Sequence, residues 1–274
     1  MAPDKLTLKS TVKLNSGYDL PLLGFGIDTA TRYYNQAESG AGLVASGVPR
    51  DQVFFTTKIS GANARDGHLT YATLAAQVDA ALAQTGLAYL DLVLIHCPYG
   101  GPRTRRAAWT ALVDAVDAGK VRSIGVSNYG VAHLDELEAL IRELEAERGP
   151  GRGGVLSVGQ YEMHPWIRHD DIEDWCARRG VVVQAYCPIV RGQRFGDAKL
   201  VALAERHGKS QAQVLLRWGL QRGYPVVIRT GRRERLMENM DVFDFELEEH
   251  EVLDLVSGEY SPCTWDPTVE PLEV

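Results

Sequence analysis

Residues 90–128 read LDLVLIHCPYGGPRTRRAAWTALVDAVDAGKVRSIGVSN, and this stretch carries the pattern that decides the fold. Its two near-continuous apolar runs, 90–96 and 121–128, are typical of parallel strands buried on both faces. Between them four apolar side chains recur at three- and four-residue spacing: Trp109, Leu112, Val113 and Val116. That spacing is typical of a helix packed on one side. The stretch therefore predicts a strand, a covering helix and a second parallel strand.

The same alternation continues along the chain. Five more apolar runs predict strands: residues 20–30, 53–60, 156–163, 181–188 and 224–230. Three more stripes predict helices: Leu74, Val78, Ala81 and Leu82; Leu134, Leu137, Leu140 and Ile141; and Val214, Leu215 and Trp218. Repeated strand–helix units predict an α/β fold with a parallel sheet, either open or closed into a TIM-type (β/α) barrel. We favour the barrel, because no GxGxxG loop of a dinucleotide-binding sheet follows the first run.

An N-terminal β-hairpin is predicted before the first buried run, since residues 11–15 and 19–23 flank the turn SGY at 16–18. The sequence holds no low-complexity linker and no repeat beyond the strand–helix rhythm. Residues 1–274 are therefore predicted to form a single barrel domain.

The composition excludes several classes of protein. The 274 residues include 29 Lys and Arg against 36 Asp and Glu, a net charge of −7, and 45% are hydrophobic and 24% charged. These values are ordinary for a globular domain and exclude a disordered chain. The acidic balance argues against nucleic acid or an anionic membrane as partner. With no apolar leader and no run near the roughly 20 apolar residues of a membrane span, we expect a cytoplasmic protein.

Four cysteines are scattered without a CxxC pair: Cys97, Cys176, Cys187 and Cys263. This pattern favours free thiols in a reducing compartment over a disulfide framework or a zinc site, and no metal is expected.

Polar side chains with useful chemistry lie at the ends of the predicted strands: Asp28, Lys58, His96, Ser127, Asn128, Gln160, Tyr186, Arg229 and Thr230. In a barrel of parallel strands, all C-terminal strand ends open onto the face where active sites are built. One buried polar group at a strand end is usually structural. A buried Lys and Asp, however, need each other or a ligand, so the whole series predicts a pocket.

These segments resemble the aldo-keto reductase family. The similarity extends over residues 13–247 through the segments LNSGYDLPLLGFG, IDTATRYYNQ, FFTTK, LDLVLIHCP, GKVRSIGVSN, GQYEMHPW, VVVQAYCP and RRERLMENMDVFDFEL. The ending GEYSPCTWDPT is similar to the fungal branch. The resemblance implies a (β/α)8 barrel that reduces aldehydes and ketones with NADPH, acts on a small-molecule carbonyl substrate and is monomeric.

The resemblance places a catalytic tetrad on Asp28, Tyr33, Lys58 and His96. Carbonyl reduction needs a hydride and a proton for the nascent alkoxide. Tyr33 is expected to donate that proton, with its pKa lowered by the ammonium of Lys58, which Asp28 holds. His96 is expected to donate a hydrogen bond to the carbonyl oxygen. Only the spacing from Asp28 favours Tyr33 over its neighbour Tyr34.

The resemblance also implies residues that bind NADPH, from its nicotinamide end to its adenine end. They are Ser127, Asn128 and Gln160 at the carboxamide, Tyr186 on the nicotinamide ring, Arg229, Thr230 and Arg235 at the 2′-phosphate, and Glu238 and Asn239 at the adenine. Arg229 stands where the family usually has lysine, and its planar fork suits a phosphate. A solvated helix start is the alternative explanation for the arginines at 229–235. Cys187 replaces the usual serine, and the proposed pocket walls are Trp166, Tyr260 and Trp265.

One segment of the family pattern is missing. In the family a helix separates GFG, which ends strand one, from IDTA, which begins strand two, whereas Gly26 here runs directly into Ile27 and Asp28. Roughly 20 residues are absent by comparison, and adjacent parallel strands need a crossover of about a dozen or more. We therefore predict seven parallel strands, with residues 24–28 as one fused strand.

The fused strand determines in which direction the side chain of Asp28 points. Asp28 points inward only in the phase that places Ile27 on the opposite side of the strand. An ion pair between Lys58 and Asp28 within about 4 Å, with Tyr33 alongside, would indicate a competent site. An open seam beside residues 53–60 would lower stability and permit self-association.

Three functional hypotheses follow. The first is an NADPH-dependent carbonyl reductase. The second is a non-redox acid–base enzyme, such as an isomerase or dehydratase, on the same scaffold. The third is a non-catalytic barrel that binds NADPH. The retained tetrad favours the enzymes, and the missing segment favours the second and third hypotheses.

Overall fold

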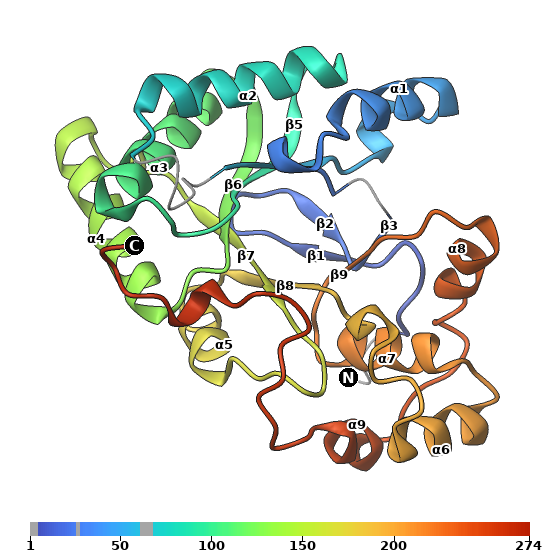
Figure 1. The fold of residues 1–274 in the computed structure, drawn as a ribbon. Helices are drawn as coiled ribbons and strands as arrows, with labels where there is room; N and C mark the ends of the chain where they lie inside the picture. The colour runs from blue at the N-terminus through green and yellow to red at the C-terminus, as the bar shows by residue number, and fades with distance from the viewer. Residues whose placement is uncertain (1–4, 26–27, 61–67) are drawn as a thin grey trace.

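The computed structural model describes residues 5–25, 28–60 and 68–274. Its core is a seven-stranded sheet in the order β3-β9-β8-β7-β6-β5-β4, with every neighbouring pair parallel (Figure 1). The strands are β3 (Leu23–Phe25), β4 (Thr56–Ile59), β5 (Leu90–Ile95), β6 (Val121–Ser127), β7 (Leu156–Glu162), β8 (Val182–Tyr186) and β9 (Val226–Ile228). The predicted barrel-type sheet of seven parallel strands is confirmed.

Helices surround the sheet on its outer side (Figure 1). They are α1 (Gln36–Ser46), α2 (Tyr71–Thr85), α3 (Gly101–Asp117), α4 (Val131–Arg148), α5 (Asp170–Ala177), α6 (Ala198–His207), α7 (Gln211–Gln221), α8 (Arg233–Met240) and α9 (Glu249–Leu255). Side chains of β5 alternate between two apolar clusters: Val93 and Ile95 pack with the helices, and Leu92 and Leu94 face the interior. Among the described residues, no helix is long and apolar enough to cross a membrane.

The predicted N-terminal hairpin is present as the antiparallel pair β1 (Thr11–Lys13) and β2 (Asp19–Pro21). Leu14 and Leu20 pack against interior side chains of β5 and β7. Asn15 Nδ2 donates to the carbonyl oxygen of Leu156 at the start of β7. The hairpin therefore covers the N-terminal end of the barrel and leaves the opposite end open.

The two edge strands of the sheet, β3 and β4, are drawn together by the chain itself. Phe25 at the end of β3 pairs with Ile228 of β9, and Asp28 forms a parallel bridge with Thr56 of β4. The Cα atoms of Phe25 and Asp28 are at most about 11 Å apart along the chain, so the ends of the two edge strands lie near each other. Thr29 bonds to β4, since its backbone N and its Oγ1 both donate to the Thr56 carbonyl oxygen, at 2.9 and 3.0 Å. The sheet is thus strongly curled, but within the described residues β3 and β4 do not pair, and a cavity of about 230 Å³ is lined by residues of both edges.

The predicted fused strand over residues 24–28 is represented by its two ends. Regular pairing of β3 ends at Phe25, and Asp28 meets β4 through a single bridge. Ile27, on which the predicted phase depended, lies outside the described residues.

Two glycines of α1 offer a matched test of how this first helix packs. A Cβ on Gly40 would lie 2.2 Å from the Thr85 carbonyl oxygen of α2, whereas a Cβ on Gly42 would meet nothing within 4 Å. We expect Gly40→Ala to lower the free energy of unfolding by about 1–3 kcal/mol or more, because backbone must move. Gly42→Ala should raise it by up to about 1 kcal/mol, because alanine is the better helix former. Denaturant titration of both variants measures this, and equal effects would contradict the close α1–α2 contact.

Candidate active site

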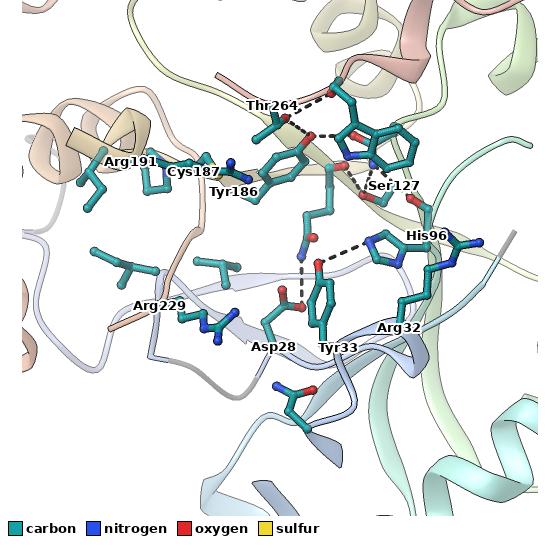
Figure 2. Close-up of a pocket in the computed structure, with 18 of the residues that line it drawn as sticks. Asp28, Arg32, Tyr33, His96, Ser127, Tyr186, Cys187, Arg191, Arg229 and Thr264 are labelled. Atoms are coloured by element: carbon teal, nitrogen blue, oxygen red, sulfur yellow. Dashed lines mark hydrogen bonds between the residues drawn. The ribbon is translucent and has the colours of Figure 1, made fainter. Parts of the chain in front are cut away.

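A cavity of about 800 Å³ opens at the C-terminal ends of the strands (Figure 2). His96 follows β5, Ser127 ends β6, Gln160 lies in β7 and Tyr186 ends β8. The hairpin covers the other end of the barrel, so these strand ends form the accessible face. The predicted convergence of distant polar residues on one pocket is therefore observed.

Lys58 and Asp28 form an ion pair at the base of this site. The Lys58 Nζ lies 2.5 and 2.6 Å from the two carboxylate oxygens of Asp28. The Lys58 side chain is 1% exposed and that of Asp28 15%. Burial lowers the pKa of Lys58, and the charge of Asp28 opposes this shift. The separation is well within the 4 Å predicted for a competent site.

Tyr33 and His96 face each other beside this pair. The Tyr33 Oη is 3.3 Å from His96 Nε2, and the two rings meet edge to face with centroids 5.3 Å apart. The Nζ of Lys58 lies 5.1 Å from the centre of the Tyr33 ring. Tyr34, by contrast, is 91% exposed and does not line the cavity. The geometry therefore favours Tyr33 over Tyr34.

The electrostatics of the site differ from the prediction at Tyr33. Burial and the charge of Asp28 raise the pKa of Tyr33, and the opposing effect of Arg229 is smaller. The expected lowering of the Tyr33 pKa is wrong for this structure, because burial and the charge of Asp28 both disfavour a tyrosinate. Burial and the charges of Lys58 and Arg32 lower the pKa of His96 to about 3. At neutral pH the site therefore holds a protonated tyrosine and a neutral imidazole.

A network of amide and hydroxyl groups lines the middle of the cavity. Asn128 Nδ2 donates to the His96 carbonyl oxygen, and Tyr186 Oη donates to Asn128 Oδ1, both at 3.0 Å. Ser127 Oγ donates to the Gln160 carbonyl oxygen at 2.8 Å. Asn128 has a φ of 63°, a left-handed conformation that asparagine tolerates well. These bonds fix the ends of β5 to β8 relative to one another.

Arginines line the end of the cavity opposite His96 (Figure 2). Arg229 and Thr230 follow β9, and Arg191 lies in a short turn after β8. The other predicted cofactor residues lie on α8 and do not line the cavity: Arg235 is exposed, Glu238 half-buried and Asn239 buried.

Of the three predicted pocket walls, only Trp265 lines the cavity, together with its neighbour Thr264. Trp166 is 3% exposed and packs away from the cavity lining, and Tyr260 is 56% exposed. Four more residues line the cavity that were not predicted as site residues: Arg32, Asn35, Arg191 and Thr264. Arg32 and Thr264 could have been found as neighbours of Tyr33 and Trp265, whereas no pattern in the sequence marked Arg191.

Glu162 at the end of β7 anchors the C-terminal segment beside the cavity. Its carboxylate accepts hydrogen bonds from the Cys263 amide at 2.5 Å, from the Thr264 hydroxyl and from His164 Nε2 at 2.8 Å. Burial alone would raise the pKa of Glu162, but these bonds lower it to about 2.

Glu162, His164 and Cys263 also bring possible metal-binding atoms within 4.8 Å of one another. The backbone N of Trp166 donates to His164 Nδ1, so Nε2 carries the ring proton that is given to Glu162. A metal-bound histidine normally donates from its other nitrogen, which here accepts. The cluster therefore suits an anchor better than a metal site.

Comparison with known proteins places the chain among oxidoreductases. It matches the model of the aldo/keto reductase family over residues 24–257. It is 36% identical over 270 residues to a glyoxal reductase of Bacillus subtilis, with 90% of this chain and 91% of that protein covered. It is 32% identical over 293 residues to a Schizosaccharomyces pombe protein described as an uncharacterized oxidoreductase, with 97% of this chain and 100% of that protein covered. That alignment is longer than the 274-residue chain, so the yeast relative has residues without a counterpart here.

Two solved structures have the same fold. One is an aldo-keto reductase from a deep-sea metagenome library, with a TM-score of 0.82, 27% identity, and 96% of this chain and 99% of that chain covered. The other is an aldo/keto reductase from Brucella melitensis, with a TM-score of 0.79, 31% identity, and 90% and 98% covered. The fold is therefore that of a barrel of this family.

Removing the carboxylate of Asp28 tests the buried ion pair. Asp28→Asn leaves the ammonium of Lys58 buried without its counter-charge, and we expect a loss of about 3–5 kcal/mol in the free energy of unfolding near neutral pH. Because burial holds the folded-state pKa of Lys58 below its unfolded value, the folded state binds fewer protons than the unfolded state. The stability of the variant should therefore rise as the pH increases from neutral toward about 10.

The matched control is Asp19→Asn on the hairpin. Asp19 pairs with Lys13 at 3.2 Å, but the two side chains are 56% and 64% exposed. This change should cost at most about 1 kcal/mol, with little dependence on pH. Denaturant titrations at several pH values compare the two variants, and similar losses would contradict a special role for the Asp28–Lys58 pair.

Proposed function

Because the chain belongs to the aldo/keto reductase family, we propose that it is an oxidoreductase that reduces an aldehyde or ketone to an alcohol with NADPH. The observation that carries the proposal is the meeting of Asp28, Tyr33, Lys58 and His96 at one end of a large cavity. A tyrosine hydroxyl and a histidine that face each other beside a buried lysine support this proposal.

The cavity suits a nicotinamide dinucleotide. Its volume of about 800 Å³ lies toward the upper end of the 300–1,000 Å³ of ligand pockets. Ser127, Asn128 and Gln160 offer amide and hydroxyl groups for a carboxamide, and the ring of Tyr186 lines the same region. Arg229 and Thr230 at the far end suit a phosphate, since a guanidinium can bind two phosphate oxygens at once. Arg235, Glu238 and Asn239 remain part of the proposal as contacts beyond the cavity.

The protein's own part in the reaction is to orient the carbonyl and supply the proton. NADPH, when bound, supplies the hydride. Tyr33 Oη and His96 Nε2 are 3.3 Å apart, so one carbonyl oxygen can accept a hydrogen bond from each. The raised pKa of Tyr33 keeps its proton in place until a strongly basic alkoxide forms. Lys58, held by Asp28, lies 5.1 Å from the centre of the Tyr33 ring, and Tyr33 itself is 43% exposed at the cavity.

The same electrostatics weigh against a non-redox acid–base enzyme. An isomerase or dehydratase needs a group that removes a proton near neutral pH. His96, with a pKa of about 3, is a weak base, and the high pKa of Tyr33 keeps this hydroxyl protonated. The carbonyl reductase therefore remains the better-supported function, and NADPH binding without turnover would identify the non-catalytic alternative.

Replacing Tyr33 tests the proton donor. Tyr33→Phe keeps the ring and removes the hydroxyl, and we expect kcat to fall about 10²–10⁴-fold. Tyr34→Phe is the matched control, because that neighbour is 91% exposed, and it should leave kcat nearly unchanged. NADPH consumption is followed with a panel of aldehydes that includes glyoxal, given the relative from Bacillus subtilis. If Tyr33→Phe kept nearly full activity, this residue would not be the acid.

Reversing the charge of Arg229 tests the preference for NADPH. Arg229→Glu should weaken NADPH binding far more than NADH binding, since only NADPH carries a 2′-phosphate. Arg142→Glu on α4, 70% exposed and away from the cavity, should affect neither cofactor. Fluorescence titration with both cofactors measures the dissociation constants, and an equal loss for the two would reject a phosphate contact.

A further inference from the structure

Arg32 brings a positive charge to the catalytic end of the cavity. It lines the cavity from the short turn Thr31–Tyr33, and its side chain is exposed there. The turn is fastened to β4, since Thr31 Oγ1 donates to the Lys58 carbonyl oxygen at 3.1 Å. Figure 2 shows Arg32 on the same side of the site as His96. The backbone that carries this arginine is therefore held in place beside the proposed reacting groups.

The position of Arg32 separates it from the other arginines of the cavity. Arg191 and Arg229 line the end opposite His96, where the phosphates of the cofactor are proposed to bind. In Figure 2, Arg32 lies on the other side of Tyr33 from Arg229. A cofactor that extends from the catalytic tyrosine toward Arg229 leaves Arg32 next to the place of the substrate.

The charges that line the cavity favour an anionic ligand. Among the described residues that line it, three arginines stand against a single carboxylate, that of Asp28. Both oxygens of this carboxylate are bonded to Lys58. The chain as a whole carries a net charge of −7. The cavity is thus a positive region in an acidic protein, and such a region concentrates anions from solution.

The charge of Arg32 acts on the catalytic centre itself. After burial and the charge of Lys58, it is the third cause that lowers the pKa of His96 to about 3. His96 Nε2 and Tyr33 Oη, 3.3 Å apart, are the groups proposed to bind the carbonyl oxygen. A carbonyl compound bound there lies in the field of the Arg32 guanidinium. An anionic group elsewhere on the same molecule is attracted toward that guanidinium.

We propose that Arg32 binds a carboxylate of the substrate, so that the preferred substrates are oxo acids, that is, aldehydes or ketones that carry a carboxylate. The inference rests on the carbonyl reduction proposed above and names its substrate class. A guanidinium presents five N–H donors in a planar fork, so it can take a carboxylate alongside its other contacts. The second attachment point orients the carbonyl toward Tyr33 and His96.

A different role for Arg32 is to act only through His96, by holding the imidazole neutral. That role concerns the carbonyl oxygen, which every substrate has, so acids and their esters would respond alike to a change at position 32. A direct contact concerns the carboxylate, so only the acids would respond. The ratio of kcat/KM for an acid to kcat/KM for its methyl ester therefore separates the two roles.

The experiment measures this ratio for three oxo acids of different length: glyoxylate, succinic semialdehyde and para-carboxybenzaldehyde, each against its methyl ester. NADPH consumption by the full-length chain is followed. The wild type should prefer the acid in at least one pair by about 10- to 100-fold, as expected for a charge-assisted hydrogen bond. The preference should weaken as the salt concentration rises, because the guanidinium is exposed.

Three variants assign the preference to Arg32. Arg32→Ala should lower the ratio about 10-fold or more in the preferred pair. Arg32→Lys should restore part of it, because a lysine keeps the charge and loses the fork. Arg142→Ala is the matched control, since this arginine of α4 is 70% exposed and does not line the cavity, and it should leave the ratio as in the wild type. Circular dichroism establishes that each variant is folded.

Two outcomes would overturn the inference while carbonyl reduction stands: no pair in which the acid is preferred, or an equal loss of acid and ester reduction in Arg32→Ala. If no carbonyl compound is reduced, the proposed function fails, and calorimetric titration then decides the inference. The ligands are the corresponding alcohols, which NADPH cannot reduce, added in its presence. A hydroxy acid should bind about 10-fold more tightly than its ester in the wild type and not in Arg32→Ala. Equal binding would reject the contact.

Discussion

The short connection from Phe25 to Asp28, with only two residues between them, is the constraint on which the rest of the structure depends. Phe25 is paired with β9 at one edge of the sheet, and Asp28 is bridged to β4 at the other. Five strands lie between these edges, and a flat sheet of that width cannot satisfy a separation of about 11 Å or less. The sheet therefore curls, and its parallel strands all end on one face. The cavity at that face is therefore a consequence of the short link as much as of the side chains that line it.

Asp28 couples this closure to the chemistry of the site. The residue that bridges Thr56 also neutralises Lys58, two positions farther along β4. A carboxylate placed in this way stabilises a buried ammonium, and its own charge disfavours a tyrosinate at Tyr33. The result is a site with a tightly held tyrosine proton and an uncharged imidazole. Such a site is better suited to giving a proton to an alkoxide than to taking one from carbon.

The sequence predicted the parts of the structure that are encoded locally. The apolar runs became strands, the hairpin formed where the SGY turn indicated, and Asp28, Lys58, His96 and Tyr186 lie at the strand ends that their positions implied. Effects that depend on three-dimensional surroundings could not be predicted. The pKa of Tyr33 is raised by burial and by the charge of Asp28, and Trp166 is 3% exposed rather than part of the cavity wall.

The cavity is lined by four parts of the chain. They are the strand ends, residues 32–35, the turn after β8 and the C-terminal segment. Asp28 and Thr29 bond directly to β4 at the point where the resemblance implies a crossover. Glu162 holds the C-terminal segment through two hydrogen bonds, from the Cys263 amide and the Thr264 hydroxyl, and a third joins it to His164. These bonds lower the pKa of Glu162 to about 2. Asp28, whose side chain is 15% exposed, and the buried Glu162 thus each fasten one part of the site: Asp28 holds Lys58, and Glu162 holds the segment that carries Thr264 and Trp265.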